Sequence, residues 1–186
     1  ATRTEAPASQ VGASVTVFTA DDIERRQLPL VAELLRSSPG AMVIRTGAAG
    51  AVTSLFVRGG ESNHNKVLLD GIPLNEPGGT FNFGNVTTEG LERVEIVRGA
   101  QSALFGSDAM ASVVQLVTKR ADRRAGRSDG QPHVSGLIEG GSFGTVHGNS
   151  TVSGTAGKTD YLAGAAGSTT DNQAPTQGLS PVGGAR

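Results

Sequence analysis

The 186-residue sequence contains no cysteine, no tryptophan, one tyrosine and almost no net charge. The absence of cysteine excludes a disulfide-stapled scaffold, a thiolate metal site and a thiol nucleophile. With 16 basic and 17 acidic residues, the chain has no strong positive field to attract nucleic acid. No apolar run reaches the roughly 18 residues of a membrane-spanning helix. Composition therefore excludes several classes of protein without indicating one.

Apolar residues and glycine are unevenly distributed along the chain. Leu, Ile, Val and Phe number 34 in residues 1–120 and nine in residues 121–186, whereas the 27 glycines divide into 13 and 14. The first part is apolar enough to form a core, and the second falls below the roughly 20% associated with disorder. A charged stretch with glycine lies between them. We therefore expect a domain over residues 1–120, a linker over 121–132 and a separate segment over 133–186.

Short strand and helix patterns alternate through the first part and predict a small α+β domain. Thr19 followed by Asp22 predicts the start of a helix, and Pro29 predicts its end. Short strands are expected at residues 15–18, 42–44, 55–58, 66–69 and 113–118. Helical turns are expected at residues 30–35 and 102–106, and residues 91–99 are predicted to be a helix end that runs into a strand.

Residues 133–186 show a period of two residues between turns marked by glycine. Strands are expected at residues 133–140, 145–153 and 159–166. Strands of about ten residues with this period are typical of transmembrane β-barrels, although a surface hairpin or a disordered tail has a similar composition. The smallest barrels need about eight such strands. We therefore expect this segment to hold only the first strands of an incomplete barrel.

Three segments of the first part resemble a known family. They are Phe56–Gly59, Val67–Asn75 and Glu92–Lys119. In order and spacing, they resemble the plug domain of TonB-dependent outer-membrane receptors. The resemblance covers roughly residues 10–120, and residues 62–64 (Ser-Asn-His) are similar to the vitamin B12 receptor branch. It implies a plug with a mixed, short-stranded sheet and short helices. Antiparallel strands of an incomplete transmembrane β-barrel are then expected to follow it.

The resemblance implies a gating and ligand-binding domain that is not an enzyme and needs no cofactor. It implies energy-coupled uptake of a bulky nutrient, such as cobalamin or a ferric siderophore, across the outer membrane. The plug would sit in the barrel lumen and face the periplasm. The partner TonB acts on an N-terminal box, which we expect to be missing here. Because residues 133–186 are too few to close a barrel, the chain is expected to be a fragment unable to transport by itself. The alternative is a stand-alone secreted or periplasmic binding module with a plug fold.

Two loops, at residues 46–53 and 75–85, are the candidate ligand-contacting segments, because plugs of the family present these loops to the outside. Small residues let the backbone approach a bulky ligand closely. The candidate substrate-binding residues are Thr46, Gly47, Ala48, Gly50, Ala51, Val52, Asn75, Phe81, Asn82 and Phe83. Two alternatives remain open: both phenylalanines pack onto the core, or barrel loops outside this chain hold most of the ligand.

Arg58 and Arg98 each precede a glycine at the end of an apolar strand. The resemblance implies that both arginines pair with glutamates on the inner barrel wall and hold the plug in place. Such pairs suit the planar, bidentate guanidinium rather than an ammonium group. Local pairing with Glu92 or Glu95 is the alternative.

The sequence predicts neither a catalytic site nor a metal site. His64 has amides and a single carboxylate as neighbours, which is a poor ligand set, so we expect a solvated turn there. Ser107 beside Asp108 lacks the glycine-flanked motif of a nucleophile elbow. No P-loop or dinucleotide-binding fingerprint is present either.

Overall fold

The structure is a computed structural model that describes residues 13–47, 50–119, 132–142, 144–156, 159–169 and 171. The chain divides into two compact units. The first comprises Ala1–Arg45 and Val52–Lys119, and the second comprises Thr46–Ala51 and Arg120–Arg186. The linker expected at residues 121–132 lies outside the described residues, except for Pro132.

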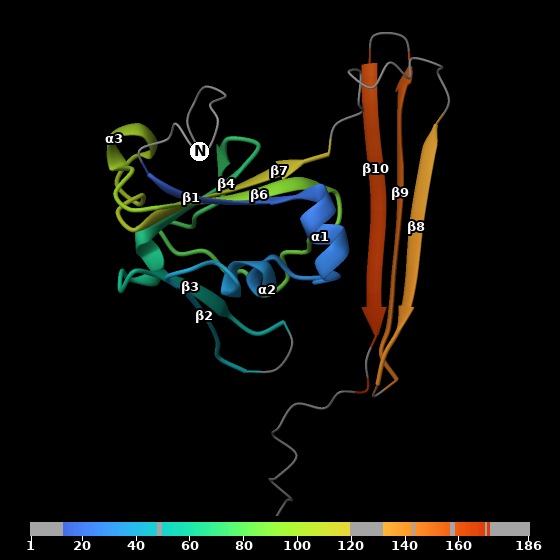
Figure 1. Cartoon of the computed structure of the whole chain (residues 1–186), viewed down its shortest axis with the longest axis horizontal. Helices are drawn as coiled ribbons and strands as arrows, with labels where there is room; N and C mark the ends of the chain where they lie inside the picture. Colours follow the sequence, from blue (N-terminus) through green and yellow to red (C-terminus); the bar gives the residue numbers. More distant parts are fainter. Residues whose placement is uncertain are drawn as a thin grey trace, which may run out of the picture. The chain divides into compact units, whose positions relative to one another are not determined.

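A five-stranded sheet forms the centre of the first unit, in the order β1-β6-β7-β4-β5 (Figure 1). Its strands are β1 (Ser14–Thr19), β4 (Asn65–Leu69), β5 (Ile72–Pro73), β6 (Leu91–Arg98) and β7 (Ser112–Thr118). β4 and β7 run parallel, and the other neighbouring strands run antiparallel. This mixed sheet confirms the predicted α+β class.

Leu91–Arg98 is a strand along its whole length, so the helix end predicted at its start is wrong. The strand pairs with β7 from Leu91 opposite Thr118 to Arg98 opposite Ser112, with an irregularity between Leu91 and Arg93. A bulge adds one residue to one strand and shifts its period of two. The adjacent charged residues Glu92 and Arg93 fall at this bulge, which explains why the sequence pattern looked helical.

Short helices and a hairpin lie on one face of the sheet (Figure 1). They are α1 (Ala20–Arg26), α2 (Val31–Arg36), and the pair β2 (Ala41–Arg45) and β3 (Thr53–Val57). α1 begins as predicted, because the Thr19 hydroxyl oxygen accepts the Asp22 N–H and the Asp22 carboxylate accepts the Thr19 N–H. Two shorter elements, η2 (Ser62–His64) and α3 (Ser102–Phe105), complete this unit.

Two apolar clusters pack against opposite faces of the sheet. The larger cluster includes Val94 and Ile96 of β6, together with Leu34 of α2, all 0% exposed. The smaller cluster contains Val97 and Leu68, with partly buried Phe105 from α3. Successive strand residues point to opposite faces, so β6 contributes to both clusters.

The second unit contains three antiparallel strands in the order β10-β9-β8. They are β8 (His133–Gly140), β9 (Val146–Ala156) and β10 (Thr159–Thr169), so strands form where the sequence predicts them. Their register places Val134 opposite Val152 on one face and Ser135 opposite Thr151 on the other. The described strands form an open sheet. No helix in the described ranges is both long and apolar enough to cross a membrane.

Candidate functional site

The first predicted ligand loop connects β2 to β3. Thr46, Gly47, Gly50 and Val52 are exposed and Ala51 is half-buried, whereas Ala48 lies outside the described residues. Thr53, where the loop ends and β3 begins, is only 1% exposed. The described part of the loop therefore consists of small, mostly exposed residues, and the loop ends at the buried residue Thr53.

The side chain of Asn75, in the second predicted loop, is bound to main chain. Its Oδ1 accepts the Val67 N–H (2.8 Å), and its Nδ2 donates to the carbonyl oxygens of Asn65 (2.9 Å) and Gly79 (2.7 Å). Both amide hydrogens are thereby used. Asn75 holds this loop against β4.

Asn82 joins the second loop to the beginning of β3. Its Oδ1 accepts the N–H groups of Thr53 and Gly84, both at 2.9 Å. The Phe83 N–H donates to the Thr53 carbonyl oxygen at 2.9 Å, so both backbone polar groups of Thr53 are bound to this segment. Asn82 is nevertheless exposed, and its amide nitrogen makes no hydrogen bond within the described part of the chain. The structure thus connects the ends of the two predicted loops.

The two phenylalanines of the second loop occupy different environments. Phe83 is 2% exposed and belongs to the larger core cluster, whereas Phe81 is partly buried beside that cluster. The rings meet edge to face, with centroids 4.7 Å apart and an interplanar angle of 81°. Phe83 is therefore a core residue, and only Phe81 presents aromatic surface from this loop.

Arg98, at the end of β6, lies in a cage of neutral oxygen atoms and is 7% exposed. Its Nη1 donates to Thr16 Oγ1 (2.8 Å), Ser38 Oγ (2.7 Å) and the Pro39 carbonyl oxygen (3.1 Å). Its Nε and Nη2 both donate to Ser14 Oγ, at 3.2 and 2.8 Å. No carboxylate among the described residues shares this cage.

Arg58, the residue after β3, is exposed and has a left-handed backbone, with φ of 51° followed by 77° at Gly59. A non-glycine residue in this region is uncommon and slightly strained. A Cβ added at Gly99 would lie 3.7 Å from Arg58 Nη1, so the Arg58 guanidinium lies beside the residue that follows Arg98. The structure thereby brings together the two arginines that the sequence singled out.

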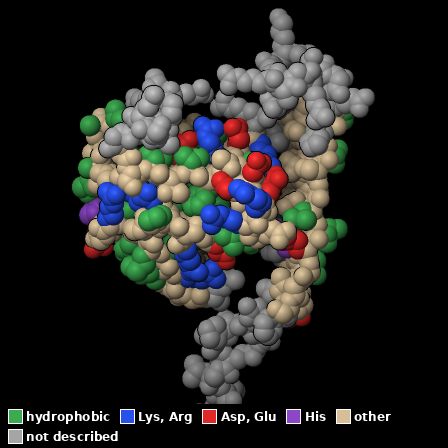
Figure 2. Space-filling view, in the orientation of Figure 1, with side chains coloured by type: hydrophobic (Ala, Val, Ile, Leu, Met, Phe, Trp, Pro, Cys, Tyr) green, Lys and Arg blue, Asp and Glu red, His purple; other side chains and the backbone are tan. Residues whose placement is uncertain are grey.

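Some cations of the first unit pair with carboxylates, and others, among them Arg58 and Arg98, do not within the described residues. Elsewhere on this unit, basic and acidic side chains lie side by side (Figure 2), as in the pairs Arg93–Glu95 (2.7 Å) and Lys66–Asp108 (2.8 Å). Neither Arg58 nor Arg98 forms an ion pair within the described ranges, and Glu95 pairs with Arg93 instead. Burial, together with the charge of Arg58, lowers the pKa of Arg98. The site therefore carries positive charge that no described carboxylate neutralises.

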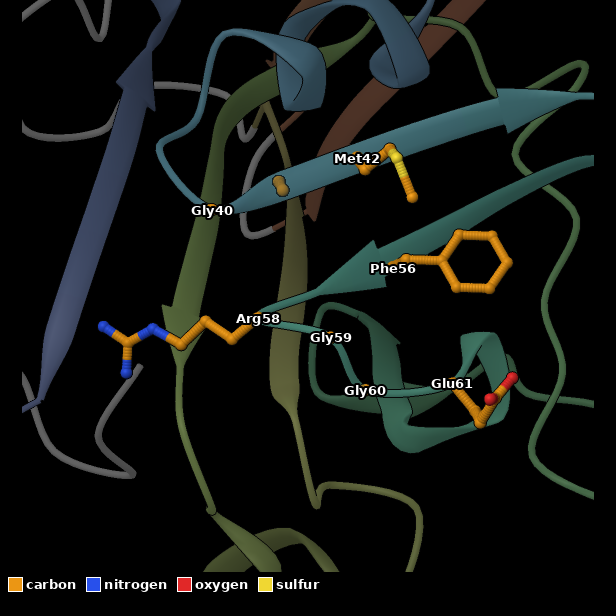
Figure 3. Close-up of a pocket in the computed structure, with 8 residues that line it drawn as sticks. Gly40, Met42, Phe56, Arg58, Gly59, Gly60 and Glu61 are labelled. Carbon is orange, nitrogen blue, oxygen red and sulfur yellow. The ribbon is translucent and has the colours of Figure 1, made fainter.

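A shallow hollow of about 470 Å³ lies beside Arg58, on the outer face of the β2–β3 hairpin (Figure 3). Met42 and Phe56, which are paired in register, form its apolar side, and Glu61 lies at its edge. The Arg58 side chain extends away from these two apolar residues. Sequence reasoning missed this surface, although Met42 and Ile44 alternate with Val43 and are 56% and 41% exposed.

The polar residues considered for catalysis or metal binding serve local structure. His64 Nδ1 accepts the Glu61 N–H at 3.3 Å within the turn η2. Ser107 donates to Asp108, whose carboxylate also accepts from Lys66. Within the described residues, no group of three or more His, Asp or Glu side chains could hold a metal ion.

Comparison with known proteins identifies the family. A family model, the TonB-dependent Receptor Plug Domain, matches residues 7–113. The chain belongs to this family. The vitamin B12 transporter BtuB of Vibrio vulnificus (strain CMCP6) is 36% identical over 126 residues, which are 68% of this chain and 21% of that protein. The resemblance seen in the sequence is thus confirmed, and a plug of this family is not an enzyme.

Solved receptors share the fold. The siderophore receptor PirA from Acinetobacter baumannii is 23% identical, with a TM-score of 0.64, over 84% of this chain and 24% of PirA. The ferripyoverdine receptor of the outer membrane of Pseudomonas aeruginosa is 22% identical, with a TM-score of 0.67, over 86% of this chain and 20% of that receptor. The plug chain therefore spans between a fifth and a quarter of the length of these proteins.

Proposed function

We propose that this plug belongs to a longer, energy-coupled outer-membrane receptor that takes up a bulky nutrient, either cobalamin or a ferric siderophore. The ligand class rests on the relatives, which include a vitamin B12 transporter and a receptor bound to ferripyoverdine. Strands β8–β10 are then the first strands of the receptor wall, and TonB acts from the periplasmic side.

The observation that carries the proposal is the positive charge of Arg58 and Arg98. A buried guanidinium with only neutral partners, beside a second guanidinium, is stabilised by carboxylates that approach from outside the plug. In the receptor, glutamates of the inner wall supply these carboxylates. Ion pairs at one end of the sheet hold the plug in the receptor, and because these pairs can break, the plug can still be displaced.

Within the two candidate loops, we assign the ligand contacts to the accessible residues. The ligand contacts the accessible groups of both loops, namely Thr46, Gly47, Gly50, Val52, the exposed edge of Phe81 and the Asn82 amide nitrogen. Asn75 and Phe83 support this surface without contacting the ligand, because the Asn75 amide is hydrogen-bonded to main chain and the Phe83 ring lies in the core.

The test is uptake by the receptor that contains this plug, expressed in a host without its own cobalamin and siderophore receptors. We expect uptake of radiolabelled cyanocobalamin or of a ferric siderophore, and loss of that uptake in a host without TonB. Uptake of neither ligand by a receptor correctly inserted in the outer membrane would overturn the proposal. Stoichiometric binding of either ligand by the isolated chain would favour the stand-alone binding module.

A further inference from the structure

The donors of Arg98 are almost fully occupied within the plug. A guanidinium has five N–H donors. The single Nε donor, both Nη1 donors and one Nη2 donor bind the hydroxyls of Ser14, Thr16 and Ser38 and the Pro39 carbonyl oxygen. One Nη2 hydrogen remains. A bidentate carboxylate needs two parallel N–H donors, so it can bind Arg98 only after at least one of these hydrogen bonds has broken.

Arg58 offers the opposite situation. Its side chain is exposed, and its guanidinium makes no hydrogen bond or ion pair with any described residue. Its stem passes Gly40, where an added Cβ would lie 3.6 Å from Arg58 Cγ, and its head lies near Gly99. All its donors can therefore meet a carboxylate without disturbing the plug.

The partners of Arg98 differ in how easily they are displaced. Ser38 is 3% exposed and lies in the turn after α2, so its hydroxyl is buried. Ser14 is exposed and lies directly opposite Arg98 in the register of β1 and β6. Among the described strands, β1 lies at the edge of the sheet and pairs with β6 alone. Pro39 is exposed as well, but three acceptors share the two Nη1 hydrogens, so loss of its carbonyl frees no donor. An incoming carboxylate therefore displaces the β1 hydroxyls first, the exposed Ser14 before the half-buried Thr16.

We propose that the two arginines have different roles: Arg58 is the primary carboxylate site, and Arg98 is a conditional site whose occupation releases Ser14 and Thr16 of β1. This inference rests on the proposed function, because the carboxylates come from the receptor wall. It makes Ser14 and Thr16 positioning residues, which hold Arg98 toward β1 until the wall competes for it. Binding of the plug to the receptor wall and attachment of β1 to β6 are then coupled through the Arg98 side chain.

The test is a titration of the full chain with sodium glutarate, followed by NMR of the arginine Nε–H groups. In the wild type, we expect the Arg58 signal to shift while the Arg98 signal stays unchanged at the same concentrations. Replacing both β1 hydroxyls, by Ser14→Ala with Thr16→Val, should let glutarate reach Arg98 with an affinity at least about fivefold higher. Glutaramide, which is uncharged, should shift neither signal.

Two controls keep the result clear. Ser54→Ala removes a β3 hydroxyl that Arg98 does not contact, and it should titrate like the wild type. Ser14→Ala alone serves if the double variant loses its β6 amide signals. Joint titration of both arginines in the wild type, no effect of the β1 substitutions, or no glutarate binding to Arg58 would each overturn the inference. Because the titration needs neither barrel nor nutrient, a failure of uptake would leave its result unchanged.

Discussion

The strands of the two units share a period of two residues but differ in what they bury. In β6, Val94, Ile96 and Val97 are at most 2% exposed, because apolar clusters cover both faces of the sheet. In β8, Val134 and Ile138 are 65% and 85% exposed. The difference shows that alternation fixes which residues share a face, whereas neighbouring elements determine whether that face is buried.

Side-chain size follows the same division. Strands β8–β10 carry glycine at positions such as Gly136, Gly148 and Gly164, where β6 and β7 carry valine, isoleucine and leucine. Glycine contributes no side chain to a core and loses more backbone entropy on folding. The first unit therefore has a core of its own, whereas the second leaves apolar side chains such as Val134 and Ile138 exposed.

The largest difference between the two units is expected when one apolar side chain is truncated in each. Leu34→Ala, at a fully buried position, should lower the free energy of unfolding by about 2–5 kcal/mol, because it removes contacts and leaves a cavity. Ile138→Ala, at an exposed position, should change it by less than about 0.5 kcal/mol. Urea unfolding followed by circular dichroism measures both. Equal losses would show that β8 is buried against something in solution.

A buried polar residue of the first unit should also be more sensitive to substitution than a polar residue of the second. Asn65 is 1% exposed; its Nδ2 donates to the Leu55 carbonyl oxygen (2.9 Å) and its Oδ1 accepts from Ser112 (2.7 Å). Asn65→Ala should cost about 1–3 kcal/mol, because it leaves the buried Ser112 hydroxyl and Leu55 carbonyl without partners. Asn149→Ala, on the open sheet of the second unit, is the matched control and should cost less than about 0.5 kcal/mol.

The link between the two ligand loops should have a smaller, local effect. Asn82→Ala removes the acceptor for Thr53 and Gly84 and should cost about 1 kcal/mol. Hydrogen exchange should speed up at these two amides. Asn82→Asp keeps the acceptor and should retain protection, and Asn85→Ala should leave both amides unchanged. Faster exchange in Asn82→Asp would show that the amide group, rather than an acceptor oxygen, holds the loops.

The smallest expected effect is a pH-dependent change in the free energy of unfolding. The hydrogen bond from Lys66 lowers the pKa of Asp108 below its usual 3.8. Because the folded pKa is the lower one, the contribution of this pair is complete above the unfolded pKa and is lost as the pH falls through the folded pKa. We expect less than about 1 kcal/mol, since the pair is partly exposed.

Urea unfolding of wild type and Asp108→Asn between about pH 6 and pH 2 measures this difference. The gap between the two proteins should close toward the acidic end. Asp21→Asn, on the exposed surface of α1, serves as the matched removal of charge. A gap that widens as the pH falls would contradict the assigned direction of the shift.

Local signals in the sequence predicted most elements of the fold. Thr19 and Asp22 marked the start of α1, and alternation located β8–β10, because capping and strand periodicity depend on residues close together in the chain. The bulge in β6 escaped prediction, since it depends on pairing with β7. The candidate site was predicted only in part: the sequence left Phe83 as either a ligand contact or a core residue, and the structure places it in the core.

The family, the class of fold and the two arginines could be recognised from the sequence, because they depend on motifs and on short-range patterns. The contacts that each arginine makes depend instead on the tertiary structure. Arg98 meets Ser14, Thr16 and Ser38 across 84, 82 and 60 residues of sequence, and Asn82 meets Thr53 across 29. Hydrogen bonds between such distant residues form only where the folded chain brings donor and acceptor within about 3 Å.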